Sequence, residues 1–572
     1  MNLKISKSLL FVLLFSLLLR VLWLDKIPTG VSNDELDYIL NAKTLFLTGS
    51  DISGTWNPLS LTTPGSSFPQ AEIPPLLTFI PIGILPLSLF TSKLVYVFFG
   101  VEIVIILYLI TKKLLGEKEA FFIGLVASFN PWLIYFGRTA YDTPIAILSY
   151  LLGLYSLIIF KGWKILLAFP FFFIAFYSYL GTKLIYIPFL LITIFYSWYF
   201  INKKKFIKQY LTLFILCLVP FVYFTFSAFT SESIRTSELA TPFISSIAET
   251  TDYERKLSIQ NPLTYIFSNK LTVFAKVSIE KYFNAFSPKF LFINGDDKGL
   301  FSLWIHGVFY YLDTLFVIAG LIALLQRNKR LAFLILSLIL ISPLPSVLSN
   351  LGQSYAIRSQ LLAPFLIFLI GLGIYSLIYN SKLKFRKYIL TVILVLYGFQ
   401  FLNFANIYFF RNPIYNSEAF NFSSRVLSKY LSLQEGKDVF VINGTPTTPL
   451  KHYLFYTNSL NKNTAESLKE MYATKKYEFN NIKFVDCRNA NLDSGSLIIF
   501  DPGSKCENVP LHNEYLTIPM LSDGGEILRI LNDQTCSKYK LNRYPYGLKF
   551  TDFNIENLSE KDFCEKFIIN FF

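Results

Sequence analysis

The stretch Leu361–Tyr379 reads LLAPFLIFLIGLGIYSLIY and contains no charged residue. A helix needs about 20 such residues to cross the roughly 30 Å hydrocarbon core of a bilayer. Similar apolar stretches recur along the chain, and each is long enough to be a candidate membrane span. They are Leu9–Leu24, Leu94–Ile110, Ala120–Phe136, Pro144–Phe160, Ile165–Leu180, Leu184–Phe200, Tyr210–Phe229, Gly307–Leu325, Leu331–Leu348 and Tyr388–Phe410.

The composition points in the same direction. Of the 572 residues, 53% are hydrophobic and only 16% are charged, and the mean hydropathy is +0.46. Soluble proteins carry roughly 25% charged residues. These values exclude a soluble globular enzyme, a disordered chain and a small disulfide-stapled domain. We therefore predict an all-α polytopic membrane protein with about 11 transmembrane helices.

The basic residues predict the orientation, because Lys and Arg concentrate in cytoplasmic loops. Six basic clusters share one side only if the proline-rich stretch Pro74–Phe90 does not cross the membrane. A helix interior tolerates such a density of prolines poorly. We therefore expect a cytoplasmic N-terminus, an extracytoplasmic C-terminus, and an interfacial or re-entrant Pro74–Phe90. The clusters are Lys4/Lys7, Lys112/Lys113/Lys118, Lys161/Lys164, Lys203/Lys204/Lys205/Lys208, Arg327/Lys329/Arg330 and Lys382/Lys384/Arg386/Lys387.

The net charge of +14 belongs to these cytoplasmic loops. The six clusters hold 18 basic residues, whereas the tail after Phe410 holds 19 basic and 19 acidic residues. The excess is therefore a topology signal, and nucleic acid is not expected as a partner. The membrane and a membrane-anchored substrate are the expected partners.

We predict two domains. Residues 1–410 form the membrane domain, with outer loops at 25–93 and 230–306, and residues 411–572 form an extracytoplasmic soluble domain. In this tail the short apolar runs Asp438–Asn443, Ile482–Asp486 and Ser496–Phe500 have strand length, and Ala465–Tyr472 has helical periodicity. That alternation predicts a small α/β domain.

Metal and cofactor signals are weak in this sequence. The four cysteines of the tail could form disulfides in an oxidising exterior. Three pairings are possible, and the sequence does not choose between them. Metal binding by these cysteines is the weaker interpretation, because no C-x-x-C pair exists. A chain with three histidines is poorly equipped for a histidine-based metal centre. No cofactor or metal ligand is therefore assigned, and a divalent-metal requirement stays open. The tail cysteines are Cys487, Cys506, Cys536 and Cys564.

The first candidate site is Asp34-Glu35, about ten residues beyond the first span. Two adjacent carboxylates at a membrane surface suit general-base work on an acceptor hydroxyl or amine. The alternative is a helix start, in which Ser32 or Asn33 caps a helix and acids occupy its first turn.

Cations in the short outer loops form the second candidate set. Arg138 and Asp142 flank a tight turn, where the Arg could pair with the Asp, reach the lipid headgroups or hold a phosphate. Lys183 and Arg358 lie in other outer loops on the same predicted face. A carboxylate base beside convergent cations suits a donor whose phosphate leaving group is anchored in the bilayer.

Four motifs in this order resemble the GT-C superfamily of glycosyltransferases, most closely the branch of protein O-mannosyltransferases and bacterial aminoarabinose transferases. The resemblance covers roughly residues 1–410, most firmly the first 200. The motifs are Asn33-Asp34-Glu35, Glu72-Ile73-Pro74-Pro75-Leu76, Asn130-Pro131 through Arg138-Thr-Ala-Tyr-Asp142, and Tyr179-Leu-Gly-Thr-Lys183-Leu-Ile-Tyr186-Ile-Pro188.

The resemblance implies inverting transfer of a sugar from a polyprenyl- or dolichyl-phosphate carrier to a protein, lipid or cell-envelope glycan on the outer side of the membrane. Asp34 would be the base and Glu35 its neighbour in the pocket. The residues that would serve the donor phosphate or substrate are Glu72, Arg138, Asp142, Lys183 and Arg358.

Two departures from the family pattern are visible. The aminoarabinose transferases carry a Lys before the paired prolines, where this chain has Ile73, so Lys183 or Arg358 would supply the charge. The loop Thr230–His306 is also too short for the trefoil-like domain of the protein mannosyltransferases, so their protein acceptor does not transfer to this chain.

A transporter or flippase of lipid-linked glycans is the alternative function. Transporters keep charged or broken helices at the midplane and often show internal repeats. Few charges lie within the spans of this chain, and no repeat is evident. A membrane-anchored scaffold that presents the tail is a third interpretation, but it leaves the outer carboxylates and cations without a role.

Overall fold

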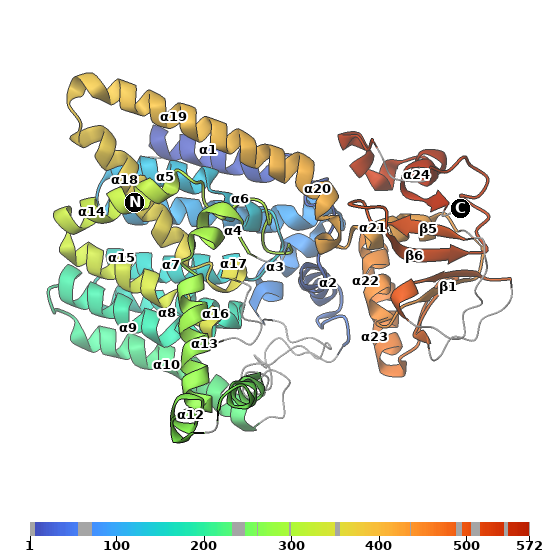
Figure 1. Ribbon diagram of the computed structural model, residues 1–572, viewed down its shortest axis with the longest axis horizontal. Helices are drawn as coiled ribbons and strands as arrows, with labels where there is room; N and C mark the ends of the chain where they lie inside the picture. Colours follow the sequence, from blue (N-terminus) through green and yellow to red (C-terminus); the bar gives the residue numbers. More distant parts are fainter. Residues whose placement is uncertain are drawn as a thin grey trace. The chain divides into compact units, whose positions relative to one another are not determined.

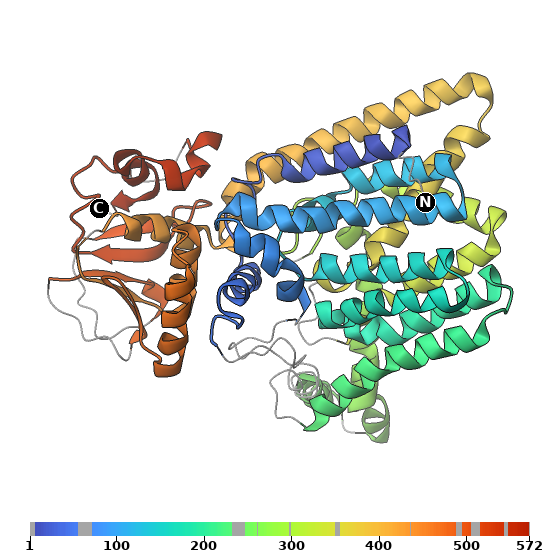
Figure 2. The same cartoon turned by 180° about the vertical axis from the view of Figure 1, so that it is seen from behind.

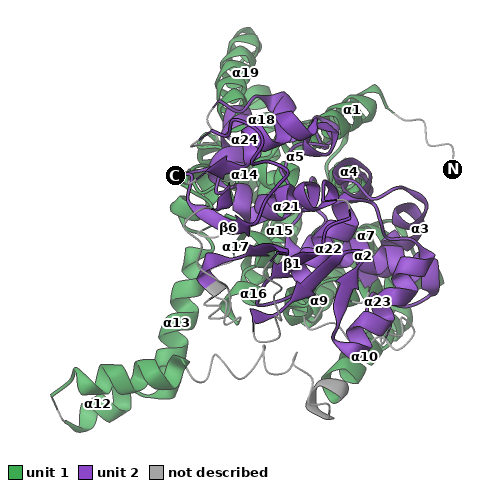
Figure 3. Ribbon diagram, turned by 90° about the vertical axis from the view of Figure 1, so that its right-hand side faces the viewer, with its two compact units in different colours: residues 1–20, 98–137, 142–404 green, residues 21–97, 138–141, 405–572 purple. Residues whose placement is uncertain are grey.

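The structure is a computed structural model that describes residues 6–54, 71, 73–230, 246–259, 261–296, 299–348, 355–434, 436–487, 495–504, 515–542 and 547–570. The chain divides into two compact units, coloured separately in Figure 3. Unit 1 comprises Met1–Arg20, Phe98–Gly137 and Asp142–Phe404, and unit 2 comprises Val21–Val97, Arg138–Tyr141 and Ala405–Phe572. Unit 2 therefore holds residues 25–93, the predicted first outer loop, together with the tail.

Helical structure covers the larger part of every predicted span (Figure 1). The helices concerned are α1 (Lys7–Val21), α4 (Leu89–Leu114), α5 (Glu117–Phe129), α6 (Pro131–Phe136), α7 (Thr143–Ile159), η2 (Gly162–Ala168), α8 (Phe169–Ser178), η3 (Gly181–Ile185), α9 (Tyr186–Tyr196), η4 (Ser197–Ile201), α10 (Ile207–Thr230), α14 (Asp313–Arg327), α15 (Lys329–Ile341), α16 (Leu344–Val347), α18 (Leu362–Asn380), α19 (Leu383–Asn406) and η6 (Ile407–Arg411). The predicted second outer loop, residues 230–306, adds α12 (Pro262–Phe267), α13 (Lys270–Asn284) and η5 (Lys289–Ile293), and α17 (Tyr355–Arg358) precedes α18.

Within the described residues, six helical segments are long and apolar enough to cross a membrane. They are Leu89–Leu114, Gly181–Ile201, Ile207–Phe226, Lys329–Val347, Leu362–Asn380 and Leu383–Tyr415. The larger number of about 11 spans, and the side on which each terminus lies, stay predictions.

The third predicted span, Ala120–Phe136, is interrupted. Asn130 ends α5 and caps α6, its side-chain oxygen accepting a hydrogen bond from Leu133 N at 3.0 Å. Pro131 occupies the first turn of α6, where its missing N–H costs nothing, and it disfavours helical backbone at the residue before it. The single helix expected from hydropathy is therefore two.

The stretch Pro74–Phe90 forms a short helix, α3 (Ile73–Ile84), before α4 begins at Leu89. Its 12 residues reach about 18 Å, which is shorter than the hydrocarbon core. Lys43 Nζ donates to the carbonyls of Gly83 at 2.7 Å and Leu85 at 2.9 Å, at the C-terminal end of α3. This ties α3 to α2 (Asn33–Thr48) within unit 2.

Small residues let the helices of unit 1 approach closely, as is usual in membrane bundles. A Cβ at Gly320 of α14 would lie 1.9 Å from Leu369 O, and one at Gly373 of α18 would lie 2.2 Å from Phe316 O. In another part of unit 1, α8 packs between α7 and α10 (Figure 2).

The tail folds around a seven-stranded sheet with the order β2-β3-β1-β4-β6-β5-β7. Strand β1 is parallel to its two neighbours β3 and β4, with Val439 opposite Ile482 and Leu497, and the other pairs are antiparallel. The strands are β1 (Val439–Ile442), β2 (Tyr477–Phe479), β3 (Ile482–Val485), β4 (Leu497–Phe500), β5 (Leu516–Pro519), β6 (Glu526–Leu531) and β7 (Ile569–Asn570). The three strand-length runs expected from the sequence are β1, β3 and β4, so this part of the prediction is confirmed.

Helices accompany the sheet, and two of them, α22 and α23, also contact α2 (Figure 1). The predicted helix over Ala465–Tyr472 is the middle of α23. The helices of the tail are α20 (Asn412–Tyr415), η7 (Ser417–Phe420), α21 (Phe422–Ser432), α22 (Thr447–Tyr456), α23 (Lys462–Thr474), η9 (Pro502–Ser504), η10 (Phe550–Phe553), η11 (Ile555–Asn557) and α24 (Glu560–Phe567).

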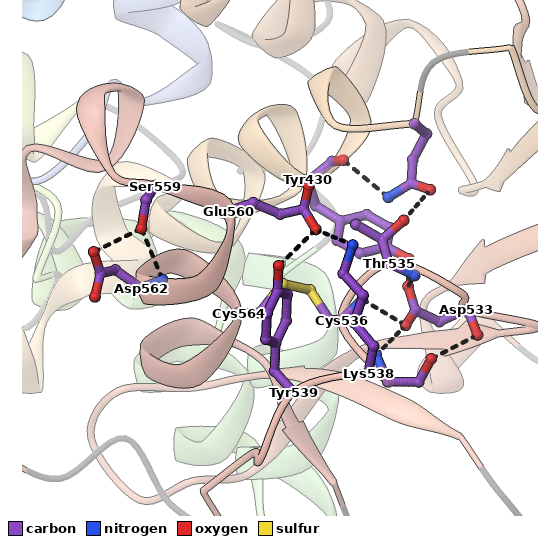
Figure 4. Close-up of a disulfide and its surroundings, with 12 residues drawn as sticks. Tyr430, Asp533, Thr535, Cys536, Lys538, Tyr539, Ser559, Glu560, Asp562 and Cys564 are labelled. Carbon is purple, nitrogen blue, oxygen red and sulfur yellow. Dashed lines mark hydrogen bonds and ion pairs between the residues drawn. A yellow bond between two sulfur atoms is a disulfide. The ribbon is translucent and has the colours of Figure 1, made fainter.

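A disulfide joins Cys536 to Cys564, the latter on α24 (Figure 4). Beside it, Cys536 N donates to Asp533 Oδ2 at 2.8 Å, and Lys538 pairs with Glu560 at 2.5 Å. Cys487 is disulfide-bonded too, and Cys506 lies outside the described residues. The structure thus selects Cys536–Cys564 from the pairings that the sequence left open.

We predict that the double variant Cys536→Ser/Cys564→Ser loses about 3 kcal/mol of tail stability, because the bond closes a loop with a sequence separation of 28. Hydrogen exchange of β5 and β6 in the full-length protein measures the loss as faster exchange. Cys217→Ser, which changes the buried cysteine outside the tail, is the control and leaves this exchange unchanged. Equal exchange in the double variant and the wild type would show that the bond does not stabilise the tail.

Candidate active site

The first turn of α2 carries the acidic pair, and it begins with a capping box. Ser32 Oγ accepts from Glu35 N at 3.4 Å, and Glu35 Oε2 accepts from Ser32 N at 2.9 Å. The other carboxylate oxygen, Glu35 Oε1, accepts from Ala140 N at 2.7 Å. Glu35 is fully buried, and each of its oxygens is bound by a backbone N–H. Capping is therefore the function that its geometry supports.

Asp34 differs from its neighbour because its side chain is exposed. It lines a pocket of about 150 Å³ between the first turn of α2 and the turn that leads from β1 into α22. Lys451 and Asp37 form an ion pair of 2.6 Å in the wall of this pocket. The lining residues are Asn33, Asp34, Leu36, Asp37, Thr445, Thr447, Thr448 and Lys451.

The segment that precedes α2, residues 25–32, is held by three buried cations. Arg138 Nη2 donates to Ile27 O at 2.8 Å, and Arg425 Nη1 donates to Thr29 O at 2.7 Å. Lys93 Nζ donates to Gly30 O at 2.6 Å. We call these three residues the cation clamp. Charged donors make stronger hydrogen bonds to carbonyls than neutral donors do, so the clamp fixes the start of α2.

Gly30 is required in this segment by close approach. A Cβ at this position would lie 2.2 Å from Phe420 O and 3.0 Å from the Tyr456 hydroxyl. Tyr456 also accepts a hydrogen bond from Val31 N at 3.2 Å, and Asn421 Nδ2 donates to Val31 O at 3.1 Å. The backbone before α2 is thus packed directly against the tail.

The first member of the cation clamp, Arg138, is one of the residues that the sequence predicts for the donor phosphate. Its Nε donates to the Tyr408 hydroxyl at 3.1 Å, and its guanidinium lies over the rings of Tyr408 and Phe409. Burial lowers the pKa of Arg138, but an arginine remains protonated at any pH that proteins tolerate. In the structure this cation binds backbone and phenol, and it orders the segment beside Asp34.

Arg425, the second member, pairs with Glu556 through two hydrogen bonds of 2.8 and 2.7 Å. Burial acts to lower the pKa of Arg425, but the charge of Glu556 outweighs it and the pKa is raised. For Glu556, burial acts to raise the pKa, and Arg425 outweighs that effect and lowers it. The pair is therefore ionised at neutral pH.

The other predicted site residues belong to unit 1, except for Glu72, which lies outside the described residues. Asp142 is buried at the start of α7 and accepts from the Thr143 hydroxyl at 3.2 Å. Lys183 is buried, with its Nζ 4.9 Å from the centre of the Phe224 ring. Arg358 ends α17 and is half-buried. Of the predicted set, the structure groups Asp34, Glu35 and Arg138 in unit 2.

Sequence reasoning missed Lys93, Arg425, Lys451 and His452. Lys93 lies directly before the predicted span Leu94–Ile110, where a lysine is typical of the end of a membrane helix. The other three lie in the tail, where no motif marks them. His452 Nε2 is 3.3 Å from Asn33 Oδ1, next to Asp34, and its Nδ1 has no hydrogen-bond partner in the described part of the chain.

No group of three or more His, Cys, Asp or Glu side chains that could hold a metal ion occurs among the described residues.

We predict that Arg425→Met lowers the free energy of unfolding by about 3 kcal/mol, because it leaves Glu556 without its partner. The value is at the lower end for buried pairs, since the Glu556 side chain is 35% exposed. Urea unfolding of the purified full-length protein measures it. Lys429→Met, one turn along α21, is the control and costs less than about 1 kcal/mol; equal losses in the two variants would contradict the assignment.

We predict a pH dependence of stability from His452. Burial, followed by the charge of Lys451, lowers its pKa from 6.5 to about 3. Between these values the unfolded chain binds a proton that the folded chain does not, so stability falls as the pH falls from 6.5 towards 3. The wild type should lose about 2 kcal/mol more than His452→Gln between pH 7 and pH 5 in urea unfolding. Parallel pH profiles of the two proteins would contradict it.

No protein-family model matches the chain, and no curated protein does. Among solved structures, the oligosaccharyltransferase of Archaeoglobus fulgidus is similar, with a TM-score of 0.45 and 14% identity over 86% of this chain and 69% of that chain. ArnT from Cupriavidus metallidurans bound to undecaprenyl phosphate has a TM-score of 0.43 and 10% identity, over 92% and 98% of the two chains. ArnT in the apo state gives 0.38 and 9%, over 91% and 96%.

Proposed function

We propose that this protein is a membrane glycosyltransferase. It moves a sugar from a polyprenyl- or dolichyl-phosphate carrier to an acceptor on the outer face of the membrane, with inversion at the anomeric carbon. The observation that carries the proposal is the contrast on the first turn of α2: Glu35 is buried and bound on both oxygens, whereas Asp34 is exposed and faces a pocket.

In this reaction Asp34 is the general base. Its carboxylate takes the proton of the acceptor's hydroxyl or amine as that atom forms a bond to the anomeric carbon. The bond from the anomeric carbon to the phosphate oxygen breaks at the same time, and its electron pair leaves with the lipid phosphate. A single displacement of this kind inverts the configuration.

The position of Asp34 supports its role. A carboxylate in the first turn of a helix is stabilised in its ionised form by the helix dipole, and the ionised form is the one that accepts a proton. The cation clamp fixes the segment before this turn, and the Glu35 capping box fixes the start of the helix. General-base catalysis needs such a fixed orientation, because a small misplacement of the base costs much of the rate.

The donor side of the proposal rests on the sequence resemblance. Lys183 or Arg358 would provide the cation for the donor phosphate, with Asp142 and Glu72 as further substrate residues. Arg138 acts as a positioning residue for the segment beside Asp34. The donor's tail stays in the bilayer, which agrees with a chain rich in apolar helices. The proposal places the N-terminus in the cytoplasm and the tail domain outside.

We predict that Asp34→Asn lowers the release of lipid phosphate at least 100-fold, because the amide cannot accept the proton. The assay incubates the purified protein and cell-envelope extract with a panel of polyprenyl-phosphate hexoses and pentoses. Released polyprenyl phosphate is then quantified by mass spectrometry.

Asp252→Asn, an exposed acid in the second outer loop, is the matched control and retains wild-type release. The Asp34→Asn protein should keep the wild-type melting temperature, because its side chain is exposed. Wild-type release by this variant would remove Asp34 as the base.

A further inference from the structure

The pocket beside Asp34 has a lining that selects for one kind of acceptor. We propose that it is the acceptor subsite and that it binds a neutral monosaccharide unit, carried by a glycan or by a glycolipid headgroup. This proposal rests on the proposed function, and it assigns new roles to Thr445, Thr447, Thr448 and Lys451 of the tail.

Seven of the eight lining residues carry a polar or charged side-chain group. Three threonines and Asn33 offer groups that both donate and accept hydrogen bonds, Asp34 and Asp37 accept, and Leu36 is the one aliphatic hydrocarbon side chain among the lining residues. A lipid chain or an apolar peptide side chain would leave these groups unpaired, at a cost in binding free energy. A polyhydroxylated ring can satisfy donors and acceptors on several sides at once.

The threonine hydroxyls are available to a ligand. No hydrogen bond of the Thr445, Thr447 or Thr448 side chain occurs within the described residues, whereas threonines inside helices bind the carbonyl four residues earlier, as Thr44 binds Leu40 O at 2.9 Å. Thr445 is exposed, and Thr447 and Thr448 are half-buried in the first turn of α22. The three threonines line the pocket, and within the described part of the chain their hydroxyls are left for a ligand.

The charge of the pocket lining restricts which acceptors can bind. Lys451 pairs with Asp37 at 2.6 Å, and the lining residues together hold two carboxylates, Asp34 and Asp37, and one cation, so their summed formal charge is negative. An anionic acceptor such as a phosphate or carboxylate group would be repelled. The volume of about 150 Å³ holds roughly five water molecules, which is the space of one monosaccharide ring.

The topology of the tail gives independent support. The turn that carries the threonines follows β1, whose neighbours β3 and β4 are parallel to it on opposite sides. The chain thus leaves β1 at a point where the strand order reverses. In open α/β sheets, ligands bind in the crevice at the carboxyl ends of the strands at such a point. In unit 2, α22 also contacts α2, and Asp34 of α2 lines the same pocket as the three threonines.

The bound sugar would present one hydroxyl to Asp34. Its oxygen forms the new glycosidic bond to the donor's anomeric carbon, its proton passes to the Asp34 carboxylate, and the lipid phosphate leaves with the electron pair of the broken bond. The threonines and Lys451 hold the rest of the ring and take no part in this exchange.

The test compares acceptors and variants in the full-length protein reconstituted in nanodiscs. The acceptors are neutral methyl glycosides and free oligosaccharides, glycolipids that carry the same headgroups, and serine- or threonine-containing peptides. We expect transfer to the glycosides or glycolipids, and the comparison of these two arms identifies the carrier of the sugar. Transfer to peptides alone would overturn the proposal.

The variant Thr447→Val/Thr448→Val removes two hydroxyls at nearly constant shape. We expect it to raise the acceptor KM about tenfold with kcat within threefold of the wild type, because the hydroxyls bind the acceptor before and during transfer. Thr445→Val, outside the helix, is a second variant in case the double variant has a lowered melting temperature. We expect it to raise the acceptor KM by a smaller factor. Thr474→Val, exposed at the end of α23, is the control with an unchanged KM.

The two proposals fail in different ways. If Asp34→Asn is inactive while the threonine variants keep the wild-type acceptor KM, the subsite is wrong and the transferase function stands. If Asp34→Asn is as active as the wild type, the proposed function fails, whatever the threonine variants do.

Discussion

Three buried cations bind the backbone carbonyls of one short segment, and the candidate site depends on that interaction. Lys93, Arg138 and Arg425 come from three distant parts of the sequence, and each donates to a carbonyl between Ile27 and Gly30. Buried cations are costly without partners. Glu556 offsets the charge of Arg425, and Lys93 is attracted by Glu35 while Arg138 and Arg425 repel it. The carbonyl dipoles of residues 27–30 take the place of water around the three cations. The cation clamp and this segment therefore stabilise each other.

The cation clamp explains why two adjacent carboxylates can have different roles. With the segment fixed, Ser32 caps α2, and Glu35 is drawn inward to bind two backbone N–H groups. The next side chain round the helix, Asp34, is then directed to the pocket shared with the tail. The capping carboxylate Glu35 and the carboxylate that we propose as the general base, Asp34, thus share one helix start. The tail contributes to both, through Arg425 on the clamp and through the threonines of the β1–α22 turn.

Much of the fold follows from sequence because apolar runs and strand-length runs are local signals. Leu361–Tyr379 matches α18, and three of the seven strands are visible as β-branched and aromatic runs. The sequence analysis missed the helix break at Asn130, because hydropathy averaged over the whole span does not register a single proline. The sequence also marked Asp34, Glu35 and Arg138, which the structure groups in unit 2, and their roles in the reaction stay predictions. Lys93 and Arg425 were not marked, because a cation that binds a carbonyl needs no neighbour in sequence and leaves no motif.

The central claim is that Asp34 acts in the chemical step and not in donor binding. The most direct measurement is the dissociation constant of a polyprenyl-phosphate sugar for the wild type and for Asp34→Asn, made without acceptor by fluorescence competition in nanodiscs. The account predicts dissociation constants that agree within about twofold, beside a loss of turnover of at least 100-fold. A dissociation constant that rises as much as turnover falls would place Asp34 in the donor site and contradict the account.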